Sequence, residues 1–381
     1  MFDVVKVGPY HPLLLEPELY EITVRDGKIT DVGIRQGYTH RGIERLMESK
    51  SFVQDVFLAE RVCGLCSQAH STAYCQAVEK IFGAEVPARA RNIRSLVFEM
   101  DRLHSHYMWF GLFFHTLHNE GQFIKIINAR ESLMDLIESI CGNRVHFSIN
   151  SIGGVRRDVT KRMLAAVKSL MGDLETLTDD ISRELRNAAP KLSGLGPLPR
   201  DKARAYGVVG PVLRASGVES DIRKDDPYAA YGEVDFEIPT EEEGDVFSRA
   251  LVRARETLES VKIIRQLIER MPKGEISVDI REPLVGEDFS RVEAPRGELI
   301  YYVRSNGTNY PERVKLRPPT YMNDRAVVEM LCEQKLADFP VILESLDRCI
   351  SCTNRVTVVD ERTGRSRRVT LDELRGVVAA T

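Results

Sequence analysis

The chain has 381 residues, of which 43% are hydrophobic, and a formal net charge of -4 at neutral pH. This length and composition allow a substantial core, in one large domain or in two closely packed ones. The nearly balanced charge gives no sign of a surface for nucleic acid or for an anionic membrane. The longest apolar stretch, residues 108–114, is far shorter than the ~20 residues that span a bilayer, and no signal peptide is recognisable. We therefore expect the protein to remain in the cytoplasm.

Residues 21–34 alternate between polar and apolar types around Asp26-Gly27, which predicts a β-hairpin near the N-terminus. Beyond the hairpin, apolar residues recur at three- and four-residue spacing, which is typical of helices. The predicted helices cover residues 51–60, 66–82, 88–118, 123–141, 159–189 and 243–272. Several of them are long enough to form a central bundle.

Residues 190–242 lack this periodicity and are rich in Gly, Pro, Asp and Tyr, which predicts a long ordered loop with a functional reason for its length. Strand patterns return at 298–305 and 312–316. We therefore predict a mainly α fold with small β parts (α+β): a central bundle of long helices with an N-terminal β hairpin and a C-terminal β region. The expected single domain divides into a β region at 1–40, a helical core at 41–272, a β/α region at 273–355 and a tail at 356–381.

Four of the seven cysteines form two CxxC pairs, Cys63/Cys66 and Cys349/Cys352. Four thiolates brought together make a site for a soft metal ion. By spacing, such pairs most often indicate structural zinc, but zinc modules usually hold both pairs within a few tens of residues, whereas these pairs lie at opposite ends of the chain. The fold must therefore bring its two ends together.

The residues around the cysteines point to a family. ERVCGLCSQAH and DRCISCTNR resemble the two nickel-binding signatures of nickel-iron hydrogenase large subunits. The resemblance continues through YTHRGIERLME, DRLHSHYMWFG, GPVLRASGVESDIRKDDPY, EAPRGELIYYVRSNGTNYP and VKLRPPTYMN, which are similar to the membrane-bound, energy-converting branch (group 4). Most of these segments also resemble the large quinone-site subunit of respiratory complex I, a relative without nickel that lacks both CxxC pairs. The cysteines separate the two branches.

The resemblance implies a nickel-iron centre that all four cysteines bind through nickel: Cys63, Cys66, Cys349 and Cys352. Cys66 and Cys352 would also bridge to an iron ion that carries one carbon monoxide and two cyanide ligands. These small ligands need hydrogen-bond donors and an apolar lining. Arg317, Pro319 and Thr320 match the stretch that supplies them in the family, with Arg317 as the donor to a cyanide. Alternatively, Arg317 caps a strand or pairs with a carboxylate.

His70 follows Cys66 by four residues, so a helix that begins there would place the imidazole and the sulfur on one face. A hydrogen bond from His70 would tune a bridging thiolate, while a buried structural histidine is the alternative. Hydrogen turnover also requires a proton exit. Glu44 occupies the glutamate of HRGIE, which relays protons in the hydrogenases that this chain resembles; the alternative is a surface ion pair with Arg41 at i,i+3 spacing.

The remaining cysteines, Cys75, Cys141 and Cys332, cannot supply the four thiolates of an iron-sulfur cluster. Electrons must therefore pass to a separate small subunit that carries a cluster. The resemblance adds a ferredoxin-like subunit or ferredoxin, membrane-embedded ion-translocating subunits, and a place on the cytoplasmic face of the cell membrane. It implies reversible reduction of protons to hydrogen, coupled to ion translocation.

Two alternatives remain open: a nickel-free, complex I-type subunit that passes electrons to a quinone or sulfur acceptor, and a zinc-stapled scaffold. His40 and Tyr74 match the residues that contact the quinone in the complex I relative. Two positions depart from the family. Arg348 stands where most members have proline, which leaves the rigidity of the second pair in doubt. Arg355 ends the second motif, after which many hydrogenases lose their tail; we expect a retained tail with a hairpin around Thr363-Gly364.

Overall fold

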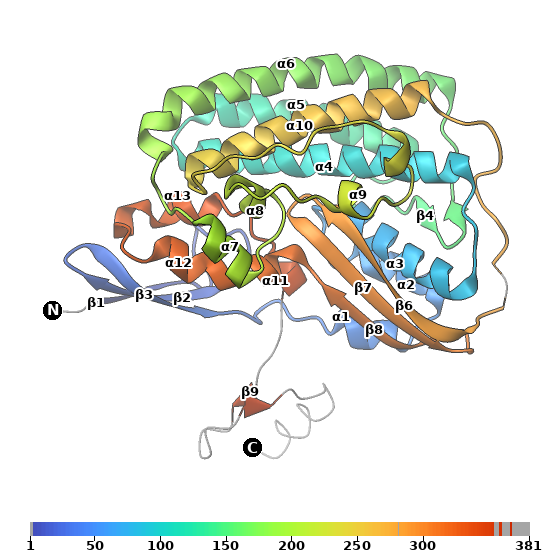
Figure 1. Ribbon diagram of the computed structural model, residues 1–381, viewed down its shortest axis with the longest axis horizontal. Helices are drawn as coiled ribbons and strands as arrows, with labels where there is room; N and C mark the ends of the chain where they lie inside the picture. Colours follow the sequence, from blue (N-terminus) through green and yellow to red (C-terminus); the bar gives the residue numbers. More distant parts are fainter. Residues whose placement is uncertain (1–2, 281, 354–357, 360–365, 368–381) are drawn as a thin grey trace.

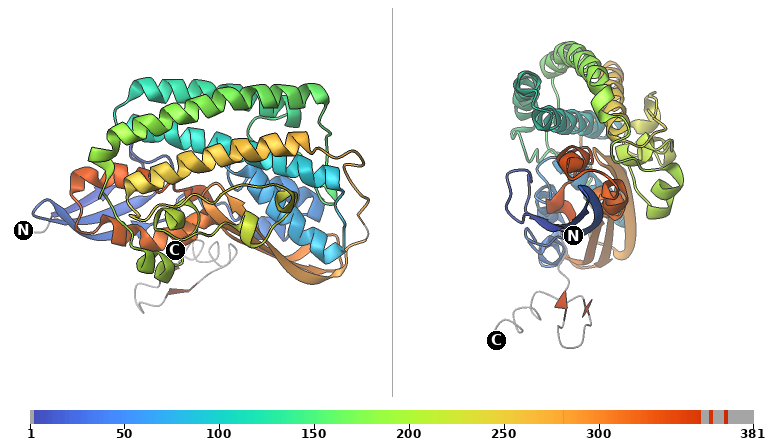
Figure 2. Two further views of the ribbon diagram at one scale, coloured as in Figure 1. Left: turned by 45° about the horizontal axis from the view of Figure 1, so that its top comes forward. Right: turned by 90° about the vertical axis from the view of Figure 1, so that its left-hand side faces the viewer.

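The computed structural model describes residues 3–280, 282–353, 358–359 and 366–367. Its four longest helices lie side by side along one side of the molecule (Figure 1 and Figure 2). They are α4 (Ala88–Thr116), α5 (Glu120–Cys141), α6 (Lys161–Leu192) and α10 (Val246–Glu269). Buried apolar side chains from all four form most of the larger core. The predicted central bundle and the mainly α character of the chain are confirmed.

Two three-stranded antiparallel sheets lie below the bundle in Figure 1. The first is β1 (Asp3–Val7), β2 (Leu19–Arg25) and β3 (Lys28–Arg35), and the second is β6 (Val285–Ala294), β7 (Gly297–Asn306) and β8 (Pro311–Arg317). The β2–β3 hairpin confirms the hairpin predicted at 21–34, and β7 and β8 confirm the strands predicted at 298–305 and 312–316. β1 and β6 were not predicted. Glycine and charged residues interrupt the apolar alternation of β6, and its ten-residue pairing with β7 stabilises it instead.

Short helices occupy the space between the sheets and the bundle. Three of them precede the bundle: α1 (Ile43–Met47), α2 (Phe52–Glu60) and α3 (Ser67–Phe82). Ser51 and Gln54 form a capping box that fixes the start of α2. Gly83, in the left-handed region at φ 63°, ends α3. Along its length, α3 packs on β6 and β7 and so positions whatever lies at its N-terminus.

The segment 190–242 crosses the molecule as an ordered chain with short helical turns (Figure 1). These are α7 (Arg200–Tyr206), α8 (Pro211–Ala215), α9 (Ile222–Asp225) and a 3₁₀ turn at Tyr231–Glu233. A small hairpin, β4 (Asn150–Ser151) with β5 (Gly154–Val155), precedes α6. The predicted long ordered loop is therefore present, and it contains brief helices that its composition did not reveal.

After β8 the chain returns beneath the bundle and beside the N-terminal sheet (Figure 1). It forms α11 (Pro319–Asn323), α12 (Val327–Leu331), α13 (Phe339–Glu344) and α14 (Ile350–Thr353), with 3₁₀ turns at Asp324–Ala326 and Leu336–Asp338. In the tail, β9 (Val358–Val359) pairs with β10 (Ser366–Arg367). Arg355 and the predicted turn at Thr363-Gly364 lie outside the described residues.

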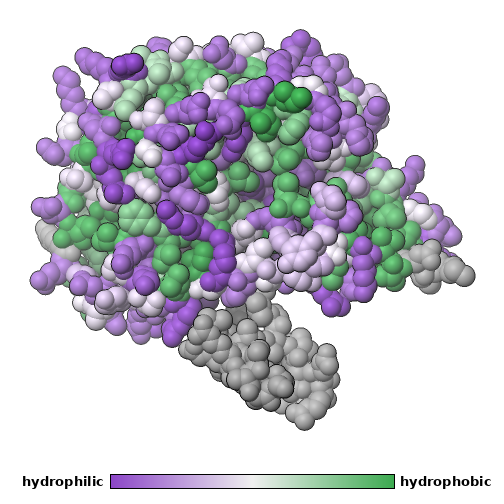
Figure 3. Space-filling model, turned by 180° about the vertical axis from the view of Figure 1, so that it is seen from behind, coloured by the Kyte–Doolittle hydropathy of each residue, from purple (hydrophilic) through white to green (hydrophobic). Residues whose placement is uncertain are grey.

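Across the part of the chain that the structure describes, no helix has the length and apolarity that a bilayer span requires. The face opposite to the view of Figure 1 intersperses apolar and polar groups (Figure 3).

Candidate metal centre

The two CxxC pairs meet although they are separated by almost the whole sequence. Cys63 lies in the turn between α2 and α3, and Cys349 directly precedes α14. Their sulfurs are 3.2 Å apart, and the sulfurs of Cys349 and Cys352 are 3.0 Å apart. Cys66 caps the N-terminus of α3, and its sulfur lies within 4.8 Å of that of Cys352. All four side chains are buried and free of disulfides, so they form a pocket of four thiols.

The electrostatics of this pocket favour a bound cation. Hydrogen bonds from the neighbouring thiols, Cys349 first, hold the pKa of Cys63 well below its usual range. The same crowding raises the pKa of Cys66 and of Cys352 well above theirs, with the contact to Cys349 as the largest cause in each. Protein groups by themselves thus do not keep all four sulfurs ionised. A soft metal ion would displace the protons, because it binds thiolates.

A small cavity adjoins three of the sulfurs, those of Cys66, Cys349 and Cys352. The rest of its lining comes from Ala294, Arg296, Pro319 and Thr320. The surface that faces this cavity is apolar, and two residues with donor groups, Arg296 and Thr320, border it. An apolar pocket with donors close by is what small diatomic ligands on an iron ion require. Thr320 also accepts a hydrogen bond from the amide of Cys349 at 3.2 Å through its hydroxyl. The donor set and this lining fit a nickel-iron centre.

The arginine in this lining is not the one expected. Arg317 forms an ion pair with Glu298, its side chain is 29% exposed, and it is absent from the described lining of the cavity. This matches the alternative interpretation, pairing with a carboxylate. Arg296 lines the cavity instead, and its guanidinium is buried. Arg296 belongs to EAPRG, part of one of the segments that resemble the family, but no spacing in the sequence relates it to the cysteines.

His70 is completely buried on α3 and touches the cluster from one side. Its Nε2 lies 3.5 Å from the sulfur of Cys352, and its Nδ1 lies 2.8 Å from the hydroxyl of Tyr301. Burial lowers the pKa of His70 to about 4, which keeps the ring neutral. His70 therefore contacts the sulfur of Cys352 from the second pair, whereas the sequence places its ring on one helix face with the sulfur of Cys66. Tyr301, which sequence reasoning missed, fixes the other face of the ring.

Glu44 lies at the start of α1 beside strand β8. Its carboxylate forms an ion pair with Lys315 at 2.7 Å and accepts a hydrogen bond from the amide of Leu316 at 3.1 Å. The side chain is 20% exposed, so one edge reaches solvent. Tyr301 lies on the inner side: burial raises its pKa well above the usual range, and the nearby charges of Cys352 and Glu44 add to this effect. Glu44 thus lies between solvent and the Tyr301–His70 contact.

Arg348, in place of the family's proline, is anchored by charge. It pairs with Glu18 and Asp324 and lies over the ring of Tyr20 at 5.6 Å. Glu18 and Tyr20 belong to the N-terminal sheet region, so these contacts dock the second cysteine pair onto that sheet. Ion pairs supply the rigidity that a proline would have given. These contacts hold the chain at Arg348, directly before the second cysteine pair, in place.

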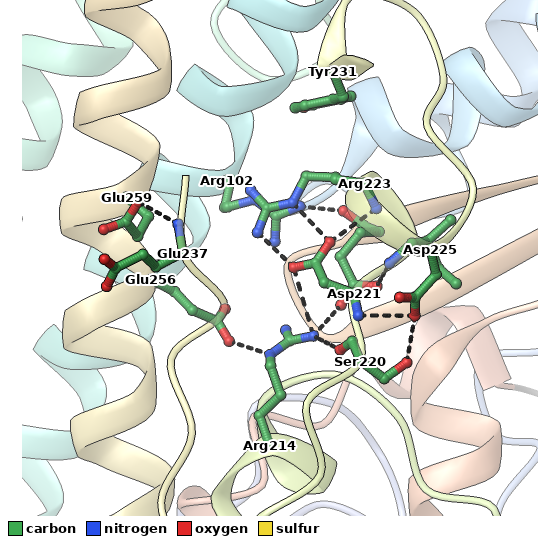
Figure 4. Close-up of polar contacts among 12 residues, drawn as sticks. Arg102, Arg214, Ser220, Asp221, Arg223, Asp225, Tyr231, Glu237, Glu256 and Glu259 are labelled. Carbon is green, nitrogen blue, oxygen red and sulfur yellow. Dashed lines mark hydrogen bonds and ion pairs between the residues drawn. The ribbon is translucent and has the colours of Figure 1, made fainter. Parts of the chain in front are cut away.

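The long segment contributes a buried charge network that includes Arg214, Asp221 and Arg223 (Figure 4). Arg214 pairs with Glu293 at 2.9 Å, and Arg223 pairs with Asp221 at 2.7 Å. Burial would raise the pKa of Asp221, but the charge of Arg223 outweighs it and holds that pKa below its usual range. Glu293 directly precedes Ala294 of the small cavity. The network therefore braces the end of β6 against the bundle.

Tyr74 and His40, the positions that match quinone contacts, differ in their exposure to solvent. Tyr74 is fully buried and donates a hydrogen bond to Asp55 at 3.3 Å, and its ring meets Tyr301 edge-on. His40 is exposed. Burial raises the pKa of Asp55 to about 8. Tyr74 thus packs behind the site, where it is shielded from solvent.

A second cavity, of about 240 Å³, opens on the other side of Cys63 and Cys349. Its apolar lining includes Leu13, Leu14, Met108, Trp109 and Leu112. Its charged lining includes Glu16, Glu18, Arg41, Arg61 and Arg348. The two cysteines that the resemblance makes terminal nickel ligands, Cys63 and Cys349, therefore line this cavity, while Cys349 also lines the smaller one together with Cys66 and Cys352.

Comparison with known proteins agrees with this geometry. Residues 119–285 and 280–355 match the family of the respiratory-chain NADH dehydrogenase 49 Kd subunit, and residues 41–169 match the nickel-dependent hydrogenase family. The carbon monoxide-induced hydrogenase of Rhodospirillum rubrum is 41% identical over 92% of this chain and 99% of its own. The membrane-bound hydrogenase subunit alpha of Pyrococcus furiosus is 35% identical over 94% and 88%.

A solved structure, from the membrane-bound sulfane sulfur reductase of an archaeal respiratory complex, superposes with a TM-score of 0.89 at 33% identity. The match covers 93% of this chain and 98% of that one. The chain thus belongs to the family that unites the large subunits of group 4 membrane-bound nickel-iron hydrogenases with the 49-kDa subunit of complex I.

Proposed function

We propose that this chain is the catalytic subunit of a nickel-iron hydrogenase that interconverts protons and hydrogen. The convergence of four buried cysteine sulfurs carries the proposal. A complex I-type role needs no such cluster. When bound, a nickel-iron centre supplies the redox chemistry of hydrogen turnover. Cys63 and Cys349 would hold nickel from the side of the larger cavity, and Cys66 and Cys352 would bridge to iron.

Other residues prepare the pocket for that centre. Arg296 supplies a buried, positively charged donor beside the bridging sulfurs, and Pro319 and Thr320 complete the lining. We transfer to Arg296 the role of donor to the small iron ligands that the sequence suggested for Arg317. His70 holds the sulfur of Cys352 from the opposite side. These groups orient the ligands and exclude water, which second-shell groups do at metal sites.

Protons leave, in this proposal, through Glu44. Its carboxylate is partly exposed, and it lies on the solvent side of Tyr301. The ion pair with Lys315 and the amide of Leu316 hold the carboxylate in place. A carboxylate with one edge in solvent can exchange its proton with water, which a relay requires.

Electrons and coupling require partners. Within the described residues, the cysteines outside the pocket are scattered: Cys75 and Cys141 are buried separately and Cys332 contacts Thr30. A small subunit with an iron-sulfur cluster would therefore deliver electrons, with ferredoxin or a ferredoxin-like subunit as donor. Homologues named as membrane-bound hydrogenases support membrane-embedded partners that translocate ions, with this chain on the cytoplasmic face.

The second candidate is a nickel-free subunit that reduces a quinone or sulfur acceptor. The observation that favours it is the TM-score of 0.89 with a sulfane sulfur reductase. One fold can host several activities, so a chain with this fold can serve in the reduction of a sulfur acceptor. Elemental analysis of the purified complex tests both. Nickel and iron in this chain, with infrared bands of metal-bound carbon monoxide and cyanide, support the hydrogenase. Absence of nickel and of these bands, in a complex whose iron belongs to the small subunit's cluster, supports the second candidate, and zinc without nickel supports a scaffold.

Replacing Cys352 with serine sharpens this test. A hard hydroxyl is a poor bridging ligand, so Cys352→Ser should lose nickel, the infrared bands and hydrogen turnover. Cys75→Ser is the matched control, because Cys75 is buried on the same helix as His70 but lies outside the pocket. Retained turnover in Cys352→Ser would show that the ligand assignment is wrong.

A further inference from the structure

We propose that two positioning residues set the geometry of the metal pocket: Arg41 clamps the two cysteine-bearing loops together, and Glu16 anchors the second of them. Both side chains come from parts of the chain that lie outside the two CxxC pairs. Both line the larger cavity beside Cys63 and Cys349. The inference deepens the proposed function, on which it rests, because it concerns the same pocket.

Arg41 joins the two loops through their main chains. Its Nη1 donates to the carbonyl of Arg61 at 2.8 Å, and its Nη2 donates to the carbonyl of Val62 at 2.8 Å. The same Nη2 donates to the carbonyl of Ser351 at 3.2 Å. Val62 directly precedes Cys63, and Ser351 directly precedes Cys352. One planar guanidinium thus contacts the chain at both CxxC segments. Arg41 and its partner in the second segment, Ser351, are 310 positions apart in the sequence.

Glu16 holds the second loop from the opposite direction. Its carboxylate accepts hydrogen bonds from the amides of Ile350 and Ser351, the latter at 2.9 Å, and from the hydroxyl of Ser351. These amides open α14, the helical turn that carries Cys352. Ser351 is therefore held through its carbonyl by Arg41 and through its amide and hydroxyl by Glu16.

Such a clamp has a physical purpose. The sulfurs of Cys63 and Cys349 repel each other when both are ionised, and without a tether the two loops could separate. Fixed main-chain contacts keep the sulfurs within 3.2 Å before any ion arrives. A preorganised pocket loses less conformational entropy when it binds a metal, which raises its affinity.

The planar shape of the Arg41 guanidinium lets one side chain bridge the two loops. Three carbonyl oxygens on two loops are met by two nitrogens of one rigid plane, whereas a lysine ammonium is a single point charge. Arg41→Lys should therefore keep the charge but lose part of the bridge. Arg45, four residues later, offers a matched control, because it is an exposed arginine that pairs with Glu48 on its own helix.

The test measures Co²⁺ binding to the full chain, through the thiolate-to-cobalt absorption band, alongside the thermal midpoint by circular dichroism. Outer-shell partners typically change metal affinity by about 10–100-fold, and we expect Arg41→Ala to weaken Co²⁺ by at least about tenfold. Arg45→Ala should leave the affinity within about twofold of the parent chain. Added guanidinium ion, at concentrations that do not unfold the chain, should restore affinity in Arg41→Ala and have no effect on Arg45→Ala.

A second arm needs no metal. Diamide takes two electrons and two protons from a thiol pair that can approach. In a Cys66→Ser/Cys352→Ser background, which removes the competing Cys349–Cys352 contact, it converts Cys63 and Cys349 to a disulfide. The rate of this trapping should fall in Arg41→Ala and in Glu16→Gln, which keeps the shape of the side chain but weakens its acceptor. Equal affinity and equal trapping in Arg41→Ala and Arg45→Ala would overturn the clamp, as would full retention of both in Arg41→Lys. If Arg41→Ala does not fold, Arg41→Lys and Glu16→Gln decide.

The two proposals fail in different ways. A parent chain that traps the disulfide but binds no soft metal would contradict the proposed metal site while leaving the clamp intact. If the parent chain binds Co²⁺ and every clamp variant binds it with the same affinity, the clamp is overturned while the metal site stands.

Discussion

Arg296 donates two hydrogen bonds to Asp347, one to its main-chain oxygen at 2.7 Å and one to its carboxylate at 2.6 Å. Asp347 has a φ of 53°, in the left-handed region that few residues other than glycine adopt, and it lies two residues before Cys349. The buried guanidinium also lines the cavity beside Cys66 and Cys352. One side chain therefore fixes an unusual backbone turn and faces the iron side of the proposed centre.

The first prediction concerns this pair. Arg296→Lys cannot hold both oxygens of Asp347 with the same geometry and leaves a buried carboxylate poorly paired. Breaking a buried ion pair typically costs about 3–5 kcal/mol, and we expect the free energy of unfolding in denaturant to fall by that order. Arg291→Lys, on strand β6 shortly before the turn that carries Arg296, has its side chain 34% exposed and paired with Asp226, and should change it by less than about 1 kcal/mol. Equal effects of the two substitutions would contradict the assignment.

The second prediction concerns Arg348. Arg348→Pro restores the residue that most of the family has, yet it should destabilise this chain. Glu18 is 1% exposed and would lose its ionic partner, which typically costs about 3–5 kcal/mol. The thermal midpoint should therefore fall. Arg313→Met is the control, because the Arg313 side chain is 41% exposed and Glu48 keeps its second ion pair, with Arg45. An unchanged midpoint in Arg348→Pro would mean that the ion pairs are dispensable.

The third prediction separates proton transfer from assembly at Glu44. Glu44→Gln keeps the shape and the acceptor for the amide of Leu316 but removes the titrating group. We expect hydrogen production and hydrogen–deuterium exchange to fall by at least about 100-fold, which is typical of a lost acid–base group, while the infrared bands of the centre persist. Glu48→Gln, on the neighbouring turn, serves as the control. Unchanged exchange in Glu44→Gln would place the proton exit elsewhere.

The fourth prediction follows from Asp55, whose pKa burial raises from 3.8 to about 8. Below pH ~4 the carboxyl is protonated in both the folded and the unfolded chain. As the pH rises towards 8, the unfolded chain releases the proton first, so the unfolding free energy should fall by up to about 1.4 kcal/mol per pH unit. Above the folded pKa, both states are ionised and the slope ends.

Asp55→Asn removes this titration and keeps an acceptor for the hydroxyl of Tyr74. Its unfolding free energy, measured in denaturant between pH 4 and 9, should fall less steeply than that of the parent chain, by up to about 1.4 kcal/mol per pH unit. A residual slope remains, because burial also raises the pKa of Glu60, Glu293 and Glu344 to about 7. Asp135→Asn, at an exposed site on α5, should retain the parental slope. Parallel profiles for the parent chain and Asp55→Asn would show that Asp55 is ionised when buried.

Local patterns were sufficient for most of the fold. Helical periodicity located the bundle helices, and alternation around Asp26-Gly27 located the hairpin, because these signals arise from residues close in sequence. Strand β6 escaped detection because its stability comes from pairing with β7. β-structure depends more on neighbours than on intrinsic preference, so its signal is not contained in the strand itself.

The sequence by itself determined the ligand chemistry: two CxxC pairs, their flanking motifs and the need for a fold that joins the chain's ends. Only the tertiary structure decided which side chains support those ligands. It brought Arg296, rather than Arg317, to the cavity, and it set Tyr301 against His70. A CxxC pair can be recognised because its two cysteines are close in sequence. The supporting contact between His70 and Tyr301, 231 positions apart, depends on how helices and sheets pack.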